Sequence, residues 1–127
     1  MRVLFIPSWY PTDKNPFAGA FIHDLAAELV SHGMEIEVVA THQHFKNLKL
    51  RSTLTEERDG VTIHHLYGWT PPKMTAIFQN MWIEDCCNRV QDLVDFSKID
   101  MIHAQDYVGL FLADKLAKLY DKSLLCT

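Results

Sequence analysis

The sequence is poor in cysteine, with three among 127 residues. Cys86 and Cys87 are adjacent, while Cys126 lies far along the chain. An odd count without regular spacing gives no disulfide framework and favours a reducing, cytoplasmic compartment. Because the adjacent pair also lacks the spacing of a zinc or redox motif, we expect its role to be helix packing.

Long apolar runs and a strong charge of one sign are also absent. No run approaches the length of a membrane-spanning helix, and the apolar opening, Val3 to Ile6, is too short for the core of a signal peptide. The net charge is -4 with histidine neutral, which argues against nucleic acid and against an anionic membrane surface as main partners. A hydrophobic share of 48% in 127 residues fits one ordinary globular domain.

Several chemical fingerprints are missing. The five glycines form no GxGxxG pattern, so an ordinary nicotinamide or flavin site is not expected. There is no nucleophile elbow with serine or cysteine. Four histidines lack a cysteine or carboxylate at a spacing that completes a tetrahedral site, so we expect no metal and no cofactor; they are His42, His44, His64 and His65.

Apolar strand-like segments alternate with helix-like ones. The predicted strands are Arg2–Ile6, Glu35–Ala40, Val61–Tyr67, Asp100–Ala104 and Ser123–Cys126, and the predicted helices are Phe17–Ser31, Ala76–Phe96 and Val108–Tyr120. Thr41–Gly60 has no clear period and is predicted to be irregular. This order predicts an α/β fold, a three-layer domain with a mostly parallel sheet.

Apolar residues at every third or fourth position indicate which helix faces are buried. In the first helix Phe21, Leu25 and Leu29 recur in this way, with Ile22 and Ala26 beside them. In the last helix the residues predicted to point inward are Leu112, Leu116 and Leu119.

Two predicted loops, Pro7–Pro16 and Gln105–Tyr107, follow the carboxyl ends of strands. Ligands of such sheets bind beyond these ends, where the strand order reverses. If the first and fourth strands are neighbours, the two loops meet at that point. The polar side chains of His103 and Gln105 would then lie at the ligand-binding edge. Two alternatives stay open: His103 as a partly buried strand histidine bonded to a backbone carbonyl, and Asp106 acting only as a helix cap.

Gly19 precedes the first helix. A helix N-terminus presents unpaired N–H groups that suit a phosphate, and a glycine lets the backbone approach a ligand closely. The alternative is that Gly19 only allows tight packing of the helix.

Several motifs, taken in order, resemble the start of family-four glycosyltransferases of the GT-B fold. They are PSWYP followed by NPFAGAFI, a helix ending SHGMEIEVVA, then DGVTIHHL, and finally IDMIHAQDYVGLFLADKLAKLYDKSLLCT. The resemblance covers most of the chain apart from Thr41–Asp59 and the middle helix. It implies that residues 1–127 are the N-terminal, Rossmann-like half of a retaining enzyme. Such enzymes transfer a sugar from a nucleotide-sugar donor to a glycan or lipid-linked acceptor, without an essential metal.

The resemblance also implies roles for particular residues. Donor-phosphate loop residues would be Ala18, Gly19 and Ala20, and acceptor-side residues would be His103, Gln105, Asp106 and Tyr107. Many relatives carry a second histidine where Gln105 stands, which puts any role of that imidazole in doubt. No catalytic residue is assigned.

The chain ends at Thr127, before a histidine that the family often places after the fifth strand, and the C-terminal donor domain is missing. We therefore expect a truncated, inactive domain that self-associates through an exposed edge. The full-length enzyme would act in polysaccharide biosynthesis in the cytoplasm, with peripheral association at the inner membrane face.

A second hypothesis comes from another class: a stand-alone binding module that completes a site with a separate catalytic subunit. An ending inside a buried strand favours truncation instead. A flavodoxin-like domain would need a Ser/Thr-rich phosphate loop after the first strand, and a response-regulator-like domain would need an acidic cluster at the strand ends. Both features are absent from the sequence.

Overall fold

The computed structural model describes residues 1–44, 51–69 and 76–127. Its elements are β1 (Arg2–Pro7), α1 (Ala20–Ser31), β2 (Glu35–His44), β3 (Ser52–Arg58), β4 (Val61–Trp69), α2 (Ala76–Leu93), a 3-10 turn (Phe96–Lys98), β5 (Met101–Gln105), α3 (Asp106–Tyr120) and β6 (Ser123–Cys126). The strands form one six-stranded sheet in the order β3-β4-β2-β1-β5-β6, and every pair is parallel except β3–β4. The predicted α/β class and mostly parallel sheet are confirmed.

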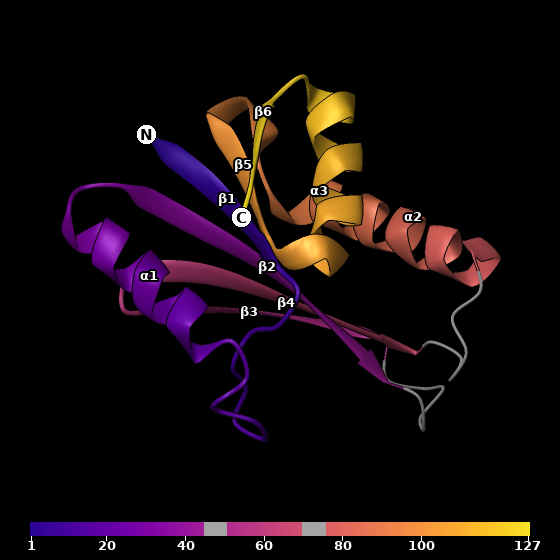
Figure 1. Ribbon diagram of the computed structural model, residues 1–127, viewed down its shortest axis with the longest axis horizontal. Coiled ribbons are helices and arrows are strands. Elements are labelled where there is room, and N and C mark those ends of the chain that lie inside the picture. Colours follow the sequence, from indigo (N-terminus) through magenta and orange to yellow (C-terminus); the bar gives the residue numbers. More distant parts are fainter. Residues whose placement is uncertain (45–50, 70–75) are drawn as a thin grey trace.

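Two apolar cores flank the sheet, with α1 on one face and α2 and α3 on the other (Figure 1). The first strand contributes to both. Val3 and Phe5 belong to the core under α1, while Leu4 and Ile6 belong to the core under α2 and α3. Because side chains alternate along a strand, an unbroken apolar run is what a strand covered on both faces requires.

The buried face of α1 differs from the predicted one. Its buried residues are Ile22, His23 and Ala26, whereas Phe21 and Leu25 are 71% and 43% exposed. Ala26 is fully buried, and its small side chain lets the helix lie close to the sheet, so the face through Ile22 and Ala26 turns inward. The prediction for α3 was correct for Leu112 and Leu116 and wrong for Leu119, which is 55% exposed.

The segment predicted to be irregular contains regular structure. β2 continues to His44, and Ser52–Arg58 forms β3, which pairs with β4 in antiparallel register. Asp59 and Gly60 connect them with φ values of 54° and 77°, which fits a tight hairpin turn. β3 escaped the sequence analysis because it is an edge strand whose polar residues mostly face solvent.

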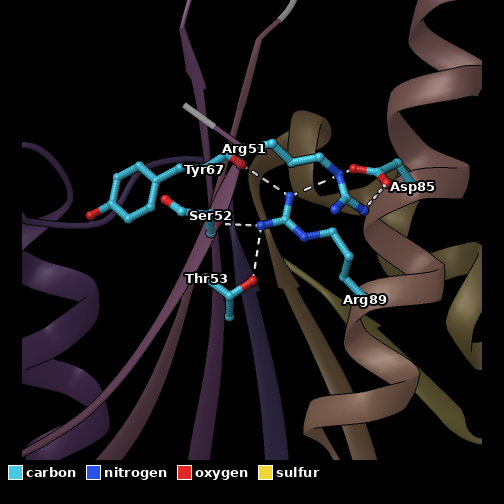
Figure 2. Close-up of polar contacts among 6 residues, drawn as sticks. All are labelled: Arg51, Ser52, Thr53, Tyr67, Asp85 and Arg89. Atoms are coloured by element: carbon cyan, nitrogen blue, oxygen red, sulfur yellow. Dashed lines mark hydrogen bonds and ion pairs between the residues drawn. The ribbon is translucent and has the colours of Figure 1, made fainter. Parts of the chain in front are cut away.

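One buried arginine fastens α2 to the end of the sheet. Arg89 is 8% exposed, and Figure 2 shows its guanidinium reaching from α2 to β3 and β4. It donates to the Tyr67 carbonyl oxygen at 3.0 Å, to Thr53 Oγ1 at 2.9 Å and to the Ser52 carbonyl oxygen. Asp85, one helical turn earlier, lies 3.6 Å from the same guanidinium. Arg89 therefore ties backbone carbonyl groups of both β3 and β4 to α2.

Candidate functional site

The strand order reverses between β1 and β5. β1 pairs with β2 on one side and with β5 on the other, and Pro7 is in register with Gln105. β1 and β5 are therefore neighbours, which is the condition under which the two predicted loops were expected to meet. The chain segments after Pro7 and Gln105 lie together at one edge of the sheet. This edge is where α/β sheets bind ligands. We call Ser8, Gln105, Asp106 and Gly109 the carboxyl-edge site.

Ser8 joins the two halves of this site. Its backbone N–H and its hydroxyl both donate to the Gln105 carbonyl oxygen at 3.2 Å, and its Oγ accepts from the Gly109 N–H at 2.9 Å. A Cβ on Gly109 would lie 2.2 Å from the Ile6 carbonyl oxygen, so only glycine lets α3 approach β1 this closely. Neither Ser8 nor Gly109 was predicted from the sequence, although a glycine inside a helix pattern is a signal of close packing.

Gln105 carries an unusual feature. Its side chain is 6% exposed, and both Nε2 and Oε1 are buried without a hydrogen-bond partner. Leaving one buried polar atom unpaired costs about 1–3 kcal/mol. Because native structures contain few such groups, this unpaired amide at the carboxyl edge of the sheet makes Gln105 a candidate contact for a polar ligand.

The predicted loop at Gln105–Tyr107 is absent, because α3 begins directly at Asp106. Asp106 makes this possible by adopting a φ of 71°, and its N–H donates to the Thr127 carbonyl oxygen at 2.8 Å. The abrupt start of the helix brings its N-terminus next to Gln105. Tyr107 lies in the first turn of α3, and its side chain falls outside the described part of the structure.

His103 lies two residues before Gln105 on the same strand and is partly buried. Its Nε2 lies 3.0 Å from Thr127 Oγ1, and its ring meets Phe5 edge-on with centroids 5.1 Å apart. Burial lowers the pKa of His103. His103 therefore matches the alternative in which it is a partly buried strand histidine with a hydrogen-bond partner inside the sheet. The partner is the Thr127 hydroxyl rather than a backbone carbonyl.

Gly19 is buried and has a left-handed φ of 68° at the start of α1. A Cβ there would lie 2.3 Å from the Trp9 carbonyl oxygen. The backbone N–H of Ala20 is used within the loop, where it donates to the Phe17 carbonyl oxygen at 3.3 Å. The structure thus shows why glycine is needed for packing, while contact of Ala18, Gly19 and Ala20 with a phosphate stays a prediction.

The loop after β1 is anchored by a buried tyrosine. Tyr10 Oη lies 2.5 Å from His23 Nδ1, and His23 Nε2 lies 2.9 Å from Asp59 Oδ2. Since Nε2 needs a hydrogen to bond a carboxylate, the tyrosine hydroxyl donates to Nδ1. Burial raises the pKa of Tyr10 to about 12. Tyr10 therefore holds the loop in place as a neutral donor and is unsuited to acting as a nucleophile.

The neighbouring histidines of β4 point to opposite faces, because successive side chains alternate along a strand. His64 Nδ1 lies 2.9 Å from Thr55 Oγ1, while His65 lies among the aromatic rings of Tyr10 and His42. The side chain of His44 is outside the described residues. Over residues 1–44, 51–69 and 76–127, no group of three or more His, Cys, Asp or Glu residues is arranged to hold a metal ion.

Comparison with solved structures shows the fold. The chain is similar to a solved protein structure described as trehalose-6-phosphate from E. coli bound with UDP-2-fluoro glucose. The TM-score is 0.65 and the sequence identity is 11%. The match covers 99% of this chain and 32% of that chain. No protein-family model and no curated protein matches the sequence. The chain thus has a mixed α/β, Rossmann-type fold that matches one half-domain of a GT-B protein, and it spans about a third of the neighbour's length. In the described part, no helix is both long and apolar enough to cross a membrane.

Proposed function

We propose that this chain is the N-terminal, acceptor-side half of a retaining GT-B glycosyltransferase. It would act on a nucleotide-sugar donor and a glycan or lipid-linked acceptor. The unpaired, buried amide of Gln105 at the reversal of strand order is the observation that carries the proposal. The solved neighbour, which contains a nucleotide-sugar analogue, supports the donor class.

The edge residues suggest how they would act. The Gln105 amide offers N–H donors and a carbonyl acceptor, which suits sugar hydroxyls. The N-termini of α1 and α3 carry a partial positive charge, which stabilises the developing charge of a departing diphosphate. Ser8 holds the start of α3 against β1 and thereby positions Gln105. Asp106 and His103 would face the acceptor from the same edge.

The chain alone would leave its ligand half enclosed. Catalysis of group transfer needs a site that excludes water, and a second, donor-binding domain would close this one. The isolated chain would then be inactive and would self-associate through the β6 edge, where Leu125 is 43% exposed. Within the cell, the full-length enzyme would work in the cytoplasm at the inner membrane face, in polysaccharide synthesis.

Titration with UDP-glucose, followed by NMR of amide groups, tests the proposal. We expect shifts at the Gln105 side-chain amide and at the backbone amides of Ser8 and Gly19. Gln105→Leu should abolish the response and should also stabilise the unliganded chain, because it removes an unpaired buried amide. The matched control, Gln91→Leu, changes an exposed glutamine on α2 and should alter neither. If the amide resonances of Gln105, Ser8 and Gly19 all stay unshifted up to millimolar UDP-glucose, the result counts against the proposed function.

A further inference from the structure

A cavity of about 420 Å³ lies between α1, the β3–β4 hairpin and the loop after β1. Ala20, His23 and Asp24 line it from α1, and their spacing of three and four residues places them on one side of the helix. Arg58 and Asp59 line it from the hairpin. We call it the hairpin cavity. Apart from Ala20, which is predicted to belong to the donor-phosphate loop, these residues have no role in the function proposed above.

A chain of hydrogen bonds fixes one wall of the cavity. Tyr10 donates to His23 Nδ1, and His23 Nε2 donates to Asp59. Burial raises the pKa of Tyr10, and the charge of Arg58 and its hydrogen bond to the hydroxyl partly offset that rise. Because a guanidinium only donates, the Tyr10 oxygen accepts from Arg58. His23 therefore uses both ring nitrogens within the chain, whereas Arg58 has further donors.

One edge of the Arg58 guanidinium lacks hydrogen-bond partners. Its Nε and Nη2 atoms are both buried and unpaired. These two nitrogens lie side by side on the planar group, and their N–H bonds run parallel, which is the arrangement that holds both oxygens of a carboxylate or phosphate. Because native proteins leave few buried donors unpaired, this edge makes Arg58 a candidate contact for an anionic group of a ligand.

The charges around Arg58 restrict the kind of anion. Asp13, Asp24 and Asp59 line the same cavity and are exposed. A phosphate group carries about two negative charges near pH 7 and would be repelled by these side chains more than a carboxylate, which carries one. The aspartates only accept hydrogen bonds, so they suit a ligand that also carries hydroxyl groups. The lining thus favours one carboxylate on a polyhydroxylated ligand.

The loop that borders the cavity is already ordered. Thr12 and Asn15 exchange two backbone hydrogen bonds of 3.1 Å, and Thr12 Oγ1 also accepts from the Asn15 N–H at 3.1 Å. Thr12 itself lines the cavity. Because Tyr10 anchors the start of this loop, a ligand would meet walls that are in place, which lowers the ordering cost of binding.

We propose that the hairpin cavity binds a sugar acid, namely a uronic acid unit of the acceptor glycan. This inference rests on the proposed function and names the class of its acceptor. The ligand carboxylate accepts hydrogen bonds from Nε and Nη2 of Arg58, and the ring hydroxyls donate to Asp13 and Asp24. No covalent bond changes here, so the cavity selects and positions the acceptor.

Titration of the whole chain with D-glucuronate, followed by NMR of the Thr12 and Asp59 backbone amides, tests the proposal. Glucose lacks the carboxylate and acetate lacks the hydroxyls, so each should bind about tenfold more weakly than glucuronate. Arg58→Lys keeps the charge but loses the planar fork, and it should raise the dissociation constant of glucuronate about tenfold. The matched control, Arg51→Lys, changes an exposed arginine that pairs with Asp85 and should leave this constant unchanged.

Equal affinity for glucuronate and either of the other two probes would overturn the proposal, as would equal affinity of the wild type and Arg58→Lys for glucuronate. The comparison of probes uses the unaltered chain, so it decides the proposal even if Arg58→Lys fails to fold.

A second titration separates this inference from the proposed function. UDP-glucose should shift the Gln105 side-chain amide and leave Thr12 and Asp59 unshifted. If glucuronate binds while Gln105 does not respond to UDP-glucose, the sugar-acid site stands and the nucleotide-sugar function fails. If Gln105 responds while glucuronate causes no shift up to millimolar concentration, the sugar-acid site is overturned and the proposed function stands. If UDP-glucose shifts Thr12 and Asp59 and glucuronate does not, the cavity holds donor phosphate and the sugar-acid site is again overturned.

Discussion

The Ser8 hydroxyl accepts a hydrogen bond from the Gly109 backbone N–H at 2.9 Å, across 101 residues of sequence. One side chain from the loop after β1 therefore caps the first turn of α3. The same hydroxyl reaches the Gln105 carbonyl oxygen, so it links the helix N-terminus to the strand end at which the unpaired amide lies. The carboxyl-edge site depends on this contact for its shape.

Ser8→Ala should reduce the free energy of unfolding by about 1 kcal/mol, the usual loss for a helix-capping hydroxyl. Urea unfolding followed by circular dichroism measures it. Ser31→Ala is the matched control, because Ser31 is exposed and its hydroxyl bonds only within the last turn of α1. Its effect should stay within about 0.5 kcal/mol. Equal losses in both variants would show that Ser8 has no special capping role.

The two helix-flanking glycines should respond differently to alanine. Gly33 has a φ of 93°, and a Cβ added there would meet no atom within 4 Å, so Gly33→Ala should cost only the left-handed backbone penalty, about 1–2 kcal/mol. Gly19→Ala adds a clash with the Trp9 backbone and should cost about 1–3 kcal/mol more. Thermal unfolding of the pair checks this. If Gly19→Ala is no less stable than Gly33→Ala, the loop that contains Trp9 can shift to accommodate the added Cβ at little energetic cost.

Arg89→Met should lower the free energy of unfolding by about 2–3 kcal/mol, because the Tyr67 and Ser52 carbonyl groups lose their donor. The control is Arg51→Met. Arg51 bonds the same Asp85 at 2.6 Å but is 62% exposed, and surface ion pairs contribute about 1 kcal/mol at most. Hydrogen exchange should also speed up at the start of β3 in the first variant alone. Similar losses in both would assign the effect to the ion pair with Asp85.

The three thiols should differ sharply in reactivity. Burial raises the pKa of Cys86 to about 12 and also raises that of Cys87, so burial disfavours the thiolate form of both. Cys126 is free and exposed. A thiol reagent should titrate Cys126 alone in the native chain, and the other two should react only in denaturant. Fast reaction of a second thiol would show that the α2 core opens without global unfolding.

The fold was largely predictable because apolar runs and turn residues mark each central element. The unbroken apolar stretch of β1 correctly predicted a strand buried on both faces. The adjacency of β1 and β5 was assumed as a condition, and the structure shows that the two strands pair. The edge strand β3 was missed because pairing with β4, more than apolar burial, holds it in place. In α1, the recurring Phe21 and Leu25 were misleading, since a tightly packed face can use a small alanine.

The site was predictable only as a location. The position of Gln105 could be inferred from the chain, because polar residues after a buried strand fall at the carboxyl edge, whereas the adjacency of β1 and β5 entered only as a condition. The orphaned state of the Gln105 amide depends on what surrounds it in space, and the contact of Ser8 with Gly109 joins segments too distant for any local pattern. The hydrogen bond between His42 and His65 likewise needs the register of β2 and β4, which sequence spacing does not contain.

The pairing of β6 with β5 places Cys126 in register with Ala104, the residue before Gln105. Strands in a sheet lie about 4.8 Å apart, so the exposed thiol stands one strand away from the strand that carries Gln105. A fluorescent dye attached there would need no engineered cysteine and would sense solvent and dielectric changes at the β5–β6 edge of the sheet. The chain thus carries a natural attachment point for an optical reporter, with which ligands could be screened by fluorescence.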